Sequence, residues 1–129
     1  MGRRLVYKTC MKVILAAALT ALVPVLAAAG PPTIVGADAV RDDMGLKFTV
    51  TLRHDDTGWD HYADGWDVLA EDGTLLATRP LRHPHVDEQP FTRSLHQVML
   101  PDGTRRVYIR ARCSKGAVSE QLGPVDIPL

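Results

Sequence analysis

The sequence predicts an all-β protein, a single antiparallel sandwich of about seven short strands. Two segments, residues 46–52 and 106–113, alternate between apolar and polar side chains, as a strand with one buried and one solvated face requires. Glycine and proline recur at fairly even intervals after residue 30, and no apolar helical period continues for more than two turns. Short strands separated by frequent turn signals are typical of a sandwich.

The two clearest strands each have an apolar face. These faces are formed by Leu46, Phe48, Val50 and Leu52 in one segment and by Val107, Ile109, Ala111 and Cys113 in the other. Because successive side chains of a strand point to opposite sides of its sheet, each set lies on one side. The two faces are therefore expected to meet in a common core.

Residues that favour turns indicate where the strands with a less regular alternation begin and end. Asp72-Gly73 permits the positive dihedral angles of a tight hairpin, and Pro101-Asp102-Gly103 closes an extended run. A helix could form only at residues 56–64, and we do not expect one there. The remaining strands are expected at residues 33–37, 66–69, 75–78, 91–100 and 124–127.

The first 29 residues differ in composition from the rest of the chain. Residues 13–26 carry no charge, follow four cations and precede a run of small residues, which is the layout of a signal peptide cleaved after Ala29. The apolar run is too short to span a bilayer as a helix, so an uncleaved anchor is the alternative we do not favour. Arg3-Arg4 resembles a twin-arginine export signal, and an ordinary Sec signal is the other interpretation.

Residues 30–129 are predicted to form one domain. They hold eleven Lys and Arg against fifteen Asp and Glu, and this mildly acidic balance argues against a nucleic-acid partner. After signal cleavage we expect no membrane span and a periplasmic or secreted protein. Cys113 would then be the only cysteine, so no intrachain disulfide can form. It is interpreted as a small buried hydrophobe, with a metal ligand or an intermolecular bridge as alternatives.

Residues 107–125, VYIRARCSKGAVSEQLGPV, combine an alternating strand that ends in a small residue, a Gly/Ser hairpin and a final Pro-Val strand. This pattern resembles the last two strands of fibronectin type III and related immunoglobulin-like domains. Trp66 falls where such sandwiches often place a core aromatic. Arg105 stands where an aromatic is usual, and Cys113 has no cysteine partner in an early strand. The resemblance implies an immunoglobulin-like sandwich and no particular function.

All five histidines lie in the body, and the densest cluster is a His-Pro-His segment. His83 and His85 are two positions apart, so in an extended segment both imidazoles would face one side. Together with Asp87, and with His61 or His54 as a further ligand, they are the donor types that suit Cu(II) or Zn(II). The alternative is a surface segment without a metal, because no second spaced ligand pair supports the site.

Two further surfaces are candidates for a partner or a small ligand. Residues 55–67 contain five aspartates, and Trp59 and Tyr62 within them could stack on a sugar or a cation. The aspartate spacing does not match an EF-hand loop, so calcium is a weaker interpretation. Arg110 and Arg112 share the outward face of one strand, where they would meet a partner or pair with acids of a neighbouring strand.

No catalytic arrangement is found in the sequence. There is no nucleophile elbow, no phosphate-binding glycine loop and no suitably placed pair of carboxylates. We therefore expect an exported, non-catalytic binding module whose leading ligand is a divalent transition metal, copper or zinc. The alternative is a structural or protein-interaction domain without a metal, which would use the Trp/Tyr/Asp loop or the Arg-rich strand face.

Overall fold

The computed structural model describes residues 2, 21–22 and 30–129. The predicted signal peptide, residues 1–29, therefore lies outside the described part of the chain except at three positions. None of the described residues forms a helix, and so none is in a helix long and apolar enough to cross a membrane. The seven strands are β1 (Thr33–Asp42), β2 (Gly45–Arg53), β3 (Ala63–Leu69), β4 (Leu75–Pro80), β5 (Phe91–Val98), β6 (Arg106–Cys113) and β7 (Gly123–Asp126).

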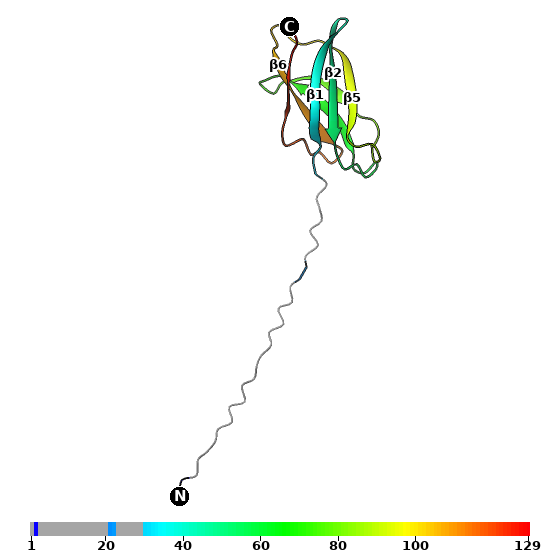
Figure 1. Ribbon diagram of the computed structural model, residues 1–129, viewed down its shortest axis with the longest axis vertical. Helices are drawn as coiled ribbons and strands as arrows, with labels where there is room; N and C mark the ends of the chain where they lie inside the picture. The colour runs from blue at the N-terminus through cyan, green and yellow to red at the C-terminus, as the bar shows by residue number, and fades with distance from the viewer. Residues whose placement is uncertain (1, 3–20, 23–29) are drawn as a thin grey trace.

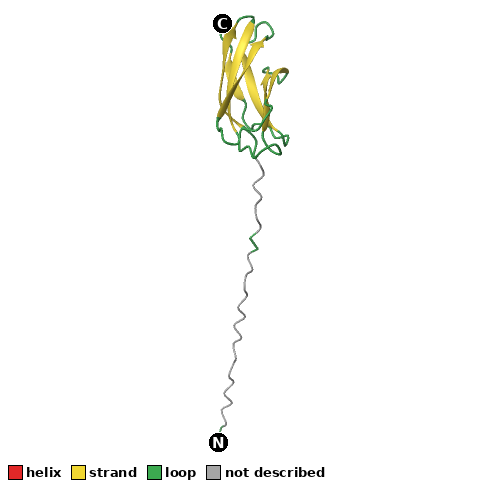
Figure 2. Cartoon of the chain, turned by 90° about the vertical axis from the view of Figure 1, so that its right-hand side faces the viewer, coloured by secondary structure: helices red, strands yellow, loops and turns green. Residues whose placement is uncertain are grey.

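The strands form two antiparallel sheets that face each other. One sheet has the order β1-β2-β5, whose members lie side by side in Figure 1, and the other has the order β4-β3-β6-β7. Figure 2 shows the two layers from the side, with loops closing both ends. The predicted all-β sandwich is confirmed, and each predicted strand corresponds to one observed strand.

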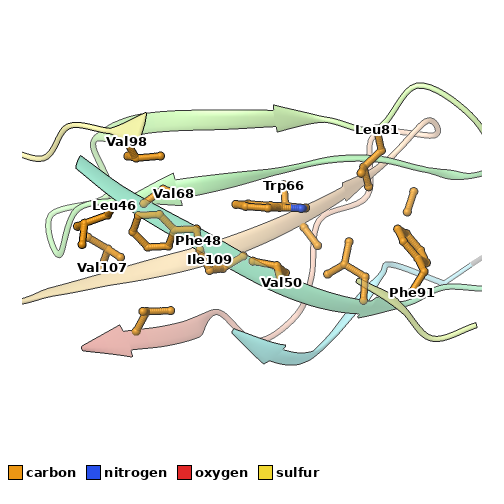
Figure 3. Close-up of a cluster of buried hydrophobic side chains, with 14 residues drawn as sticks. Leu46, Phe48, Val50, Trp66, Val68, Leu81, Phe91, Val98, Val107 and Ile109 are labelled. Carbon is orange, nitrogen blue, oxygen red and sulfur yellow. The ribbon is translucent and has the colours of Figure 1, made fainter. Parts of the chain in front are cut away.

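The core lies between the sheets and is formed by the predicted apolar faces. All eight side chains assigned inward from the alternation of residues 46–52 and 106–113 are buried. Trp66 of β3, which is fully buried, lies among the side chains of both sheets, close to Phe48 and Ile109 (Figure 3). Since burying one large apolar side chain stabilises a fold by about 1.5–3 kcal/mol, this core holds the domain together without a disulfide.

Two strands, β1 and β3, extend by three or more residues beyond the ranges that the sequence predicts. β1 continues to Asp42 and pairs with β2 as far as Gly45, so the two strands form a hairpin with Asp43 and Met44 between them. This turn contains neither glycine nor proline at its centre, and for that reason the composition does not mark it. β3 begins at Ala63, three residues before the predicted start, because its first residues pair with the end of β6.

Three strand ends meet at one end of the sandwich. β2 ends at Arg53, β3 begins at Ala63, and Ala63 is paired with Cys113 at the end of β6. Among the segments at this end are the 54–62 loop, between β2 and β3, and the 81–90 loop, between β4 and β5. Four of the five histidines lie in these loops, so the fold gathers them at one end of the molecule.

Candidate metal centre

A buried carboxylate organises the loops at this end. The Oδ1 atom of Asp56 accepts the backbone N–H of Ala63 at 2.9 Å and a ring N–H of His54, and Oδ2 accepts the backbone N–H of His85 at 2.7 Å. The Asp56 side chain is fully buried. A carboxylate removed from water in this way requires several donors, and here it receives three. Asp56 therefore fixes the 54–62 loop against both β3 and the 81–90 loop.

His54, His61 and Cys113 converge behind this carboxylate. Each is buried, and one donor atom from each lies within 4.8 Å of the other two. The His54 and His61 rings meet edge to face, with 4.5 Å between their centroids. Among the described residues this is the one group of three His, Cys, Asp or Glu side chains with such mutual distances. We call it the His54/His61/Cys113 centre.

The two imidazoles of the centre differ in their hydrogen bonds. The Nδ1 of His54 is hydrogen-bonded to Asp56, and its Nε2 lies 3.0 Å from the carbonyl oxygen of Gly30. Neither ring nitrogen of His61 has a hydrogen-bond partner among the described residues, although both are shielded from solvent. Burying a polar atom without a hydrogen-bond partner costs about 1–3 kcal/mol of folding free energy. Hydrogen bonds within the described structure therefore do not account for the burial of the His61 ring.

The donor set suits a transition metal. Two imidazoles and one thiolate are soft and borderline ligands of the kind that bind zinc and copper. With Zn–N near 2.0–2.1 Å and Zn–S near 2.3 Å, ligand atoms in a bound site lie about 3.5 Å apart, so small side-chain rotations would close the present spacing. The bond from His54 Nδ1 to Asp56 matches the outer carboxylate that orients many metal-binding histidines, and it leaves Nε2 to exchange Gly30 for an ion.

The His-Pro-His segment does not join this three-ligand group. The rings of His83 and His85 are adjacent, 4.5 Å apart, yet they do not belong to the three-ligand group found among the described residues, and neither does Asp87. His85 stacks on Phe91 at 3.9 Å, and its Nε2 accepts a hydrogen bond from Arg93 at 2.9 Å. A nitrogen that already accepts from a guanidinium has no lone pair to give to a cation.

The charge state of His85 follows from the same surroundings. Burial, and secondarily the nearby Arg93 and His83 side chains, lower the pKa of His85 below its usual value of 6.5. The ring is therefore neutral near neutral pH, with Nε2 as the acceptor that Arg93 needs. Its Nδ1 is buried without a hydrogen-bond partner in the described part of the chain and lies 4.0 Å from Asp56 Oδ2.

The predicted arginine face is engaged within its own sheet. Arg110 donates from Nη2 to Asp67 Oδ2 at 2.9 Å, and the Nε of Arg112 lies 3.2 Å from the same oxygen. Asp67 is buried on the neighbouring strand β3 and also accepts the hydroxyl of Thr78 at 2.9 Å. Of the two interpretations of Arg110 and Arg112, the geometry supports pairing with an acid across strands.

The surface predicted at residues 55–67 has a buried part and an exposed part. Asp56 and Asp67 are buried and bonded as described, and the aspartates of residues 55–67 do not form a three-ligand group within the described structure. Trp59 is 68% exposed and meets Tyr62 edge to face at 5.7 Å. The calcium interpretation thus has no cluster of carboxylates to support it, whereas the aromatic pair exists.

The sequence named a metal ligand only as an alternative role for Cys113 and did not group it with the histidines, although a usable signal was present. Extending the alternation of residues 46–52 by one step beyond Leu52 puts His54 on the inward face, and Cys113 ends the inward face of the later strand. The alternation therefore predicts that both side chains point into the core. The sequence did not indicate that β2 and β6 end at the same end of the sandwich, because this follows from the strand pairing.

Comparison with known proteins yields one informative relative. A protein named "Putative lipoprotein" from Halomicrobium mukohataei is 46% identical over 81 residues. The match covers 63% of this chain and 39% of the relative, so the chain spans about two fifths of the length of that protein. No protein-family model matches the chain, and no solved structure matches it.

Proposed function

We propose that this protein is an exported, non-catalytic binding module that holds a transition metal, zinc or copper, in the His54/His61/Cys113 centre. The observation that carries the proposal is His61, a buried imidazole whose two nitrogens have no partner in the described structure. It lies beside a second imidazole and a buried thiol. An ion bound to one His61 nitrogen would use a lone pair that is otherwise unsatisfied.

Charge balance supports a divalent ion. The ion would meet a thiolate from Cys113 and lie beside the Asp56 carboxylate that is bonded to His54. Two negative charges then match the ion, and the buried centre is neutral as a whole. Since an unbalanced charge in a protein interior is costly, a neutral centre is the arrangement that burial favours.

Export is supported by two separate observations. The residues before Gly30 have the composition of a signal peptide, and the relative from Halomicrobium mukohataei is named a lipoprotein, which fits a location in or beyond the cell envelope. The three-stranded and four-stranded sheets fit the immunoglobulin-like resemblance of residues 107–125. That architecture serves many unrelated binding roles and is compatible with the proposal.

Metal titration of the purified, reduced and metal-free protein tests the proposal. Zn²⁺ or Cu²⁺ at a hundred times its dissociation constant is expected to stabilise the fold by about 2.7 kcal/mol, which raises the melting temperature by about 10–20 °C. Cys113→Ser and His61→Asn are expected to weaken zinc binding at least tenfold. The matched controls His83→Gln and His96→Gln, which change exposed histidines, should bind as the wild type does.

Two results would overturn the assignment. If micromolar metal leaves the melting temperature of the wild type unchanged, the protein holds no tight metal site. If His83→Gln abolishes binding while Cys113→Ser retains it, the His-Pro-His segment is the site and the buried centre is not. Co²⁺ offers an independent readout, because only a thiolate ligand gives a sulfur-to-metal charge-transfer band.

A further inference from the structure

Trp59 is held out from the surface by a tight turn. Gly58 and His61 form an isolated β-bridge, in which His61 N–H donates to Gly58 O at 3.2 Å, and Thr57 N–H donates to His61 O at 2.9 Å. Trp59 is thus a central residue of this turn, where its indole is 68% exposed. The indole meets the Tyr62 ring edge to face, with 5.7 Å between the ring centroids. The turn and this contact therefore support an indole that is otherwise open to solvent.

A shallow hollow of about 630 Å³ separates Trp59 from the 81–90 loop. Val86, which is 51% exposed, provides a second apolar wall. Trp59 and Val86 belong to the two loops that Asp56 connects. The distance between these two side chains therefore depends on the buried hydrogen bonds of Asp56. The hollow is lined by Gly58, Trp59, His83, Pro84, His85, Val86, Asp87 and Glu88.

Acidic side chains line part of this hollow and are frequent in the two loops that form it. The 54–62 loop and residues 82–90 together carry five carboxylates against one guanidinium, that of Arg82. Asp56 is buried in the hydrogen-bond network, and Glu88 lies 3.3 Å from Arg93. The three remaining acids, Asp55, Asp60 and Asp87, are exposed and have no ion pair with any described residue. The hollow thus presents the exposed apolar side chains of Trp59 and Val86 beside the carboxylate of Asp87, and Asp60 follows Trp59 directly in the chain.

We propose that this hollow binds a basic segment of a partner protein, through an Arg or Lys side chain laid over the Trp59 indole. A guanidinium or ammonium is attracted to an indole face, and its aliphatic stem would contact Val86. The carboxylates of Asp60 and Asp87 would then favour the cation and speed the encounter. Tryptophan is also one of the residue types enriched among the side chains that dominate binding at protein interfaces. This inference is independent of the metal proposal.

Nuclear magnetic resonance provides a direct test, because the chain has only two tryptophans and Trp66 is fully buried. A hexa-arginine peptide is titrated into the protein at physiological salt, with hexaglutamate as the opposite probe. The Trp59 indole N–H signal is expected to shift with saturation, whereas the Trp66 signal should stay in place. Hexaglutamate should shift neither signal.

Substitutions separate the aromatic from the electrostatic contribution. Trp59→Ala should weaken binding of hexa-arginine about tenfold, and Trp59→Phe, which keeps a ring, should lose less. Asp87→Asn should weaken binding by about two- to fivefold and reduce its salt dependence. Asp102→Asn, which removes an exposed acid from the turn between β5 and β6, is the matched control and should bind like the wild type.

Three outcomes would overturn the inference. Unchanged affinity of Trp59→Ala would exclude the hollow as the site. Equal binding of both peptides would exclude recognition of positive charge. A Trp59 shift caused by neutral oligosaccharides but not by hexa-arginine would show that the aromatic pair stacks on sugars instead.

Discussion

Asp56 Oδ2 accepts the backbone N–H of His85 at 2.7 Å, and this bond joins two loops that are 29 residues apart in the chain. Through its other oxygen the same carboxylate holds Ala63 and His54. One buried side chain thus sets the position of an imidazole in the His54/His61/Cys113 centre and of the loop that forms one wall of the Trp59 hollow. The inner and the outer candidate sites share this support.

Replacement of Asp56 should destabilise the fold strongly. In Asp56→Asn one acceptor oxygen becomes an NH₂ group that faces backbone N–H donors, and the His54 ring loses its ionic partner. Because breaking one side of a buried charged network costs about 3–5 kcal/mol, the urea midpoint should fall steeply. Asp102→Asn, at an exposed turn, is the control and should leave the midpoint in place. Equal midpoints for the two variants would contradict the role given to Asp56.

Stability should decrease on the acidic side of neutrality because of His85. Its pKa in the folded protein lies below the usual 6.5 through burial, with Arg93 and His83 contributing. Between the folded and the unfolded pKa the unfolded chain binds a proton that the folded protein does not. The free energy of unfolding therefore falls as the pH drops below about 6.5.

His85→Gln isolates this contribution from the other titrating groups. Chemical denaturation between about pH 7.5 and about pH 5 should show a smaller loss of stability in the variant than in the wild type. Identical pH profiles would mean that His85 titrates normally in the folded protein. His96→Gln, which removes an exposed histidine, should retain the wild-type profile in the range where His85 acts.

The Asp67–Arg110 pair should be energetically coupled, unlike the exposed pair on the same sheet. Asp67 is only 4% exposed and receives two hydrogen bonds from Arg110. A double-mutant cycle with Asp67→Ala and Arg110→Ala should give a coupling of at least about 1 kcal/mol. The same cycle for Arg106 and Asp126, both well exposed, should give no measurable coupling. Similar coupling energies for the two pairs would show that burial does not strengthen the interaction between Asp67 and Arg110.

The strands could be predicted because apolar residues recur at every second position of the sequence, as buried side chains do along a strand. Phe48, Ile109 and their neighbours at every second position are buried between the sheets, as the alternation indicates. Turns with a strong local signal were also predicted, and Gly73 has the positive φ of 88° that the Asp-Gly pair suggested. The hairpin between β1 and β2 was missed because Asp43 and Met44 have no comparable conformational preference.

The site was less accessible to prediction because its parts are distant in sequence. His83 and His85 attracted attention through their local spacing, but spacing alone could not reveal that Arg93 occupies one imidazole nitrogen. The structure instead joins His54 and His61 to Cys113, which is more than fifty residues away in the chain. That contact depends on the pairing of Ala63 with Cys113, a consequence of the complete sheet.

X-ray absorption spectroscopy of the zinc-loaded protein identifies the ligand atoms of the His54/His61/Cys113 centre. We expect one sulfur near 2.3 Å and two imidazole nitrogens near 2.0–2.1 Å around each zinc ion, with the sulfur contribution missing in Cys113→Ser. A first shell of nitrogen and oxygen without sulfur would contradict this assignment. In that case the metal would be bound elsewhere, and the buried histidines and thiol would be structural.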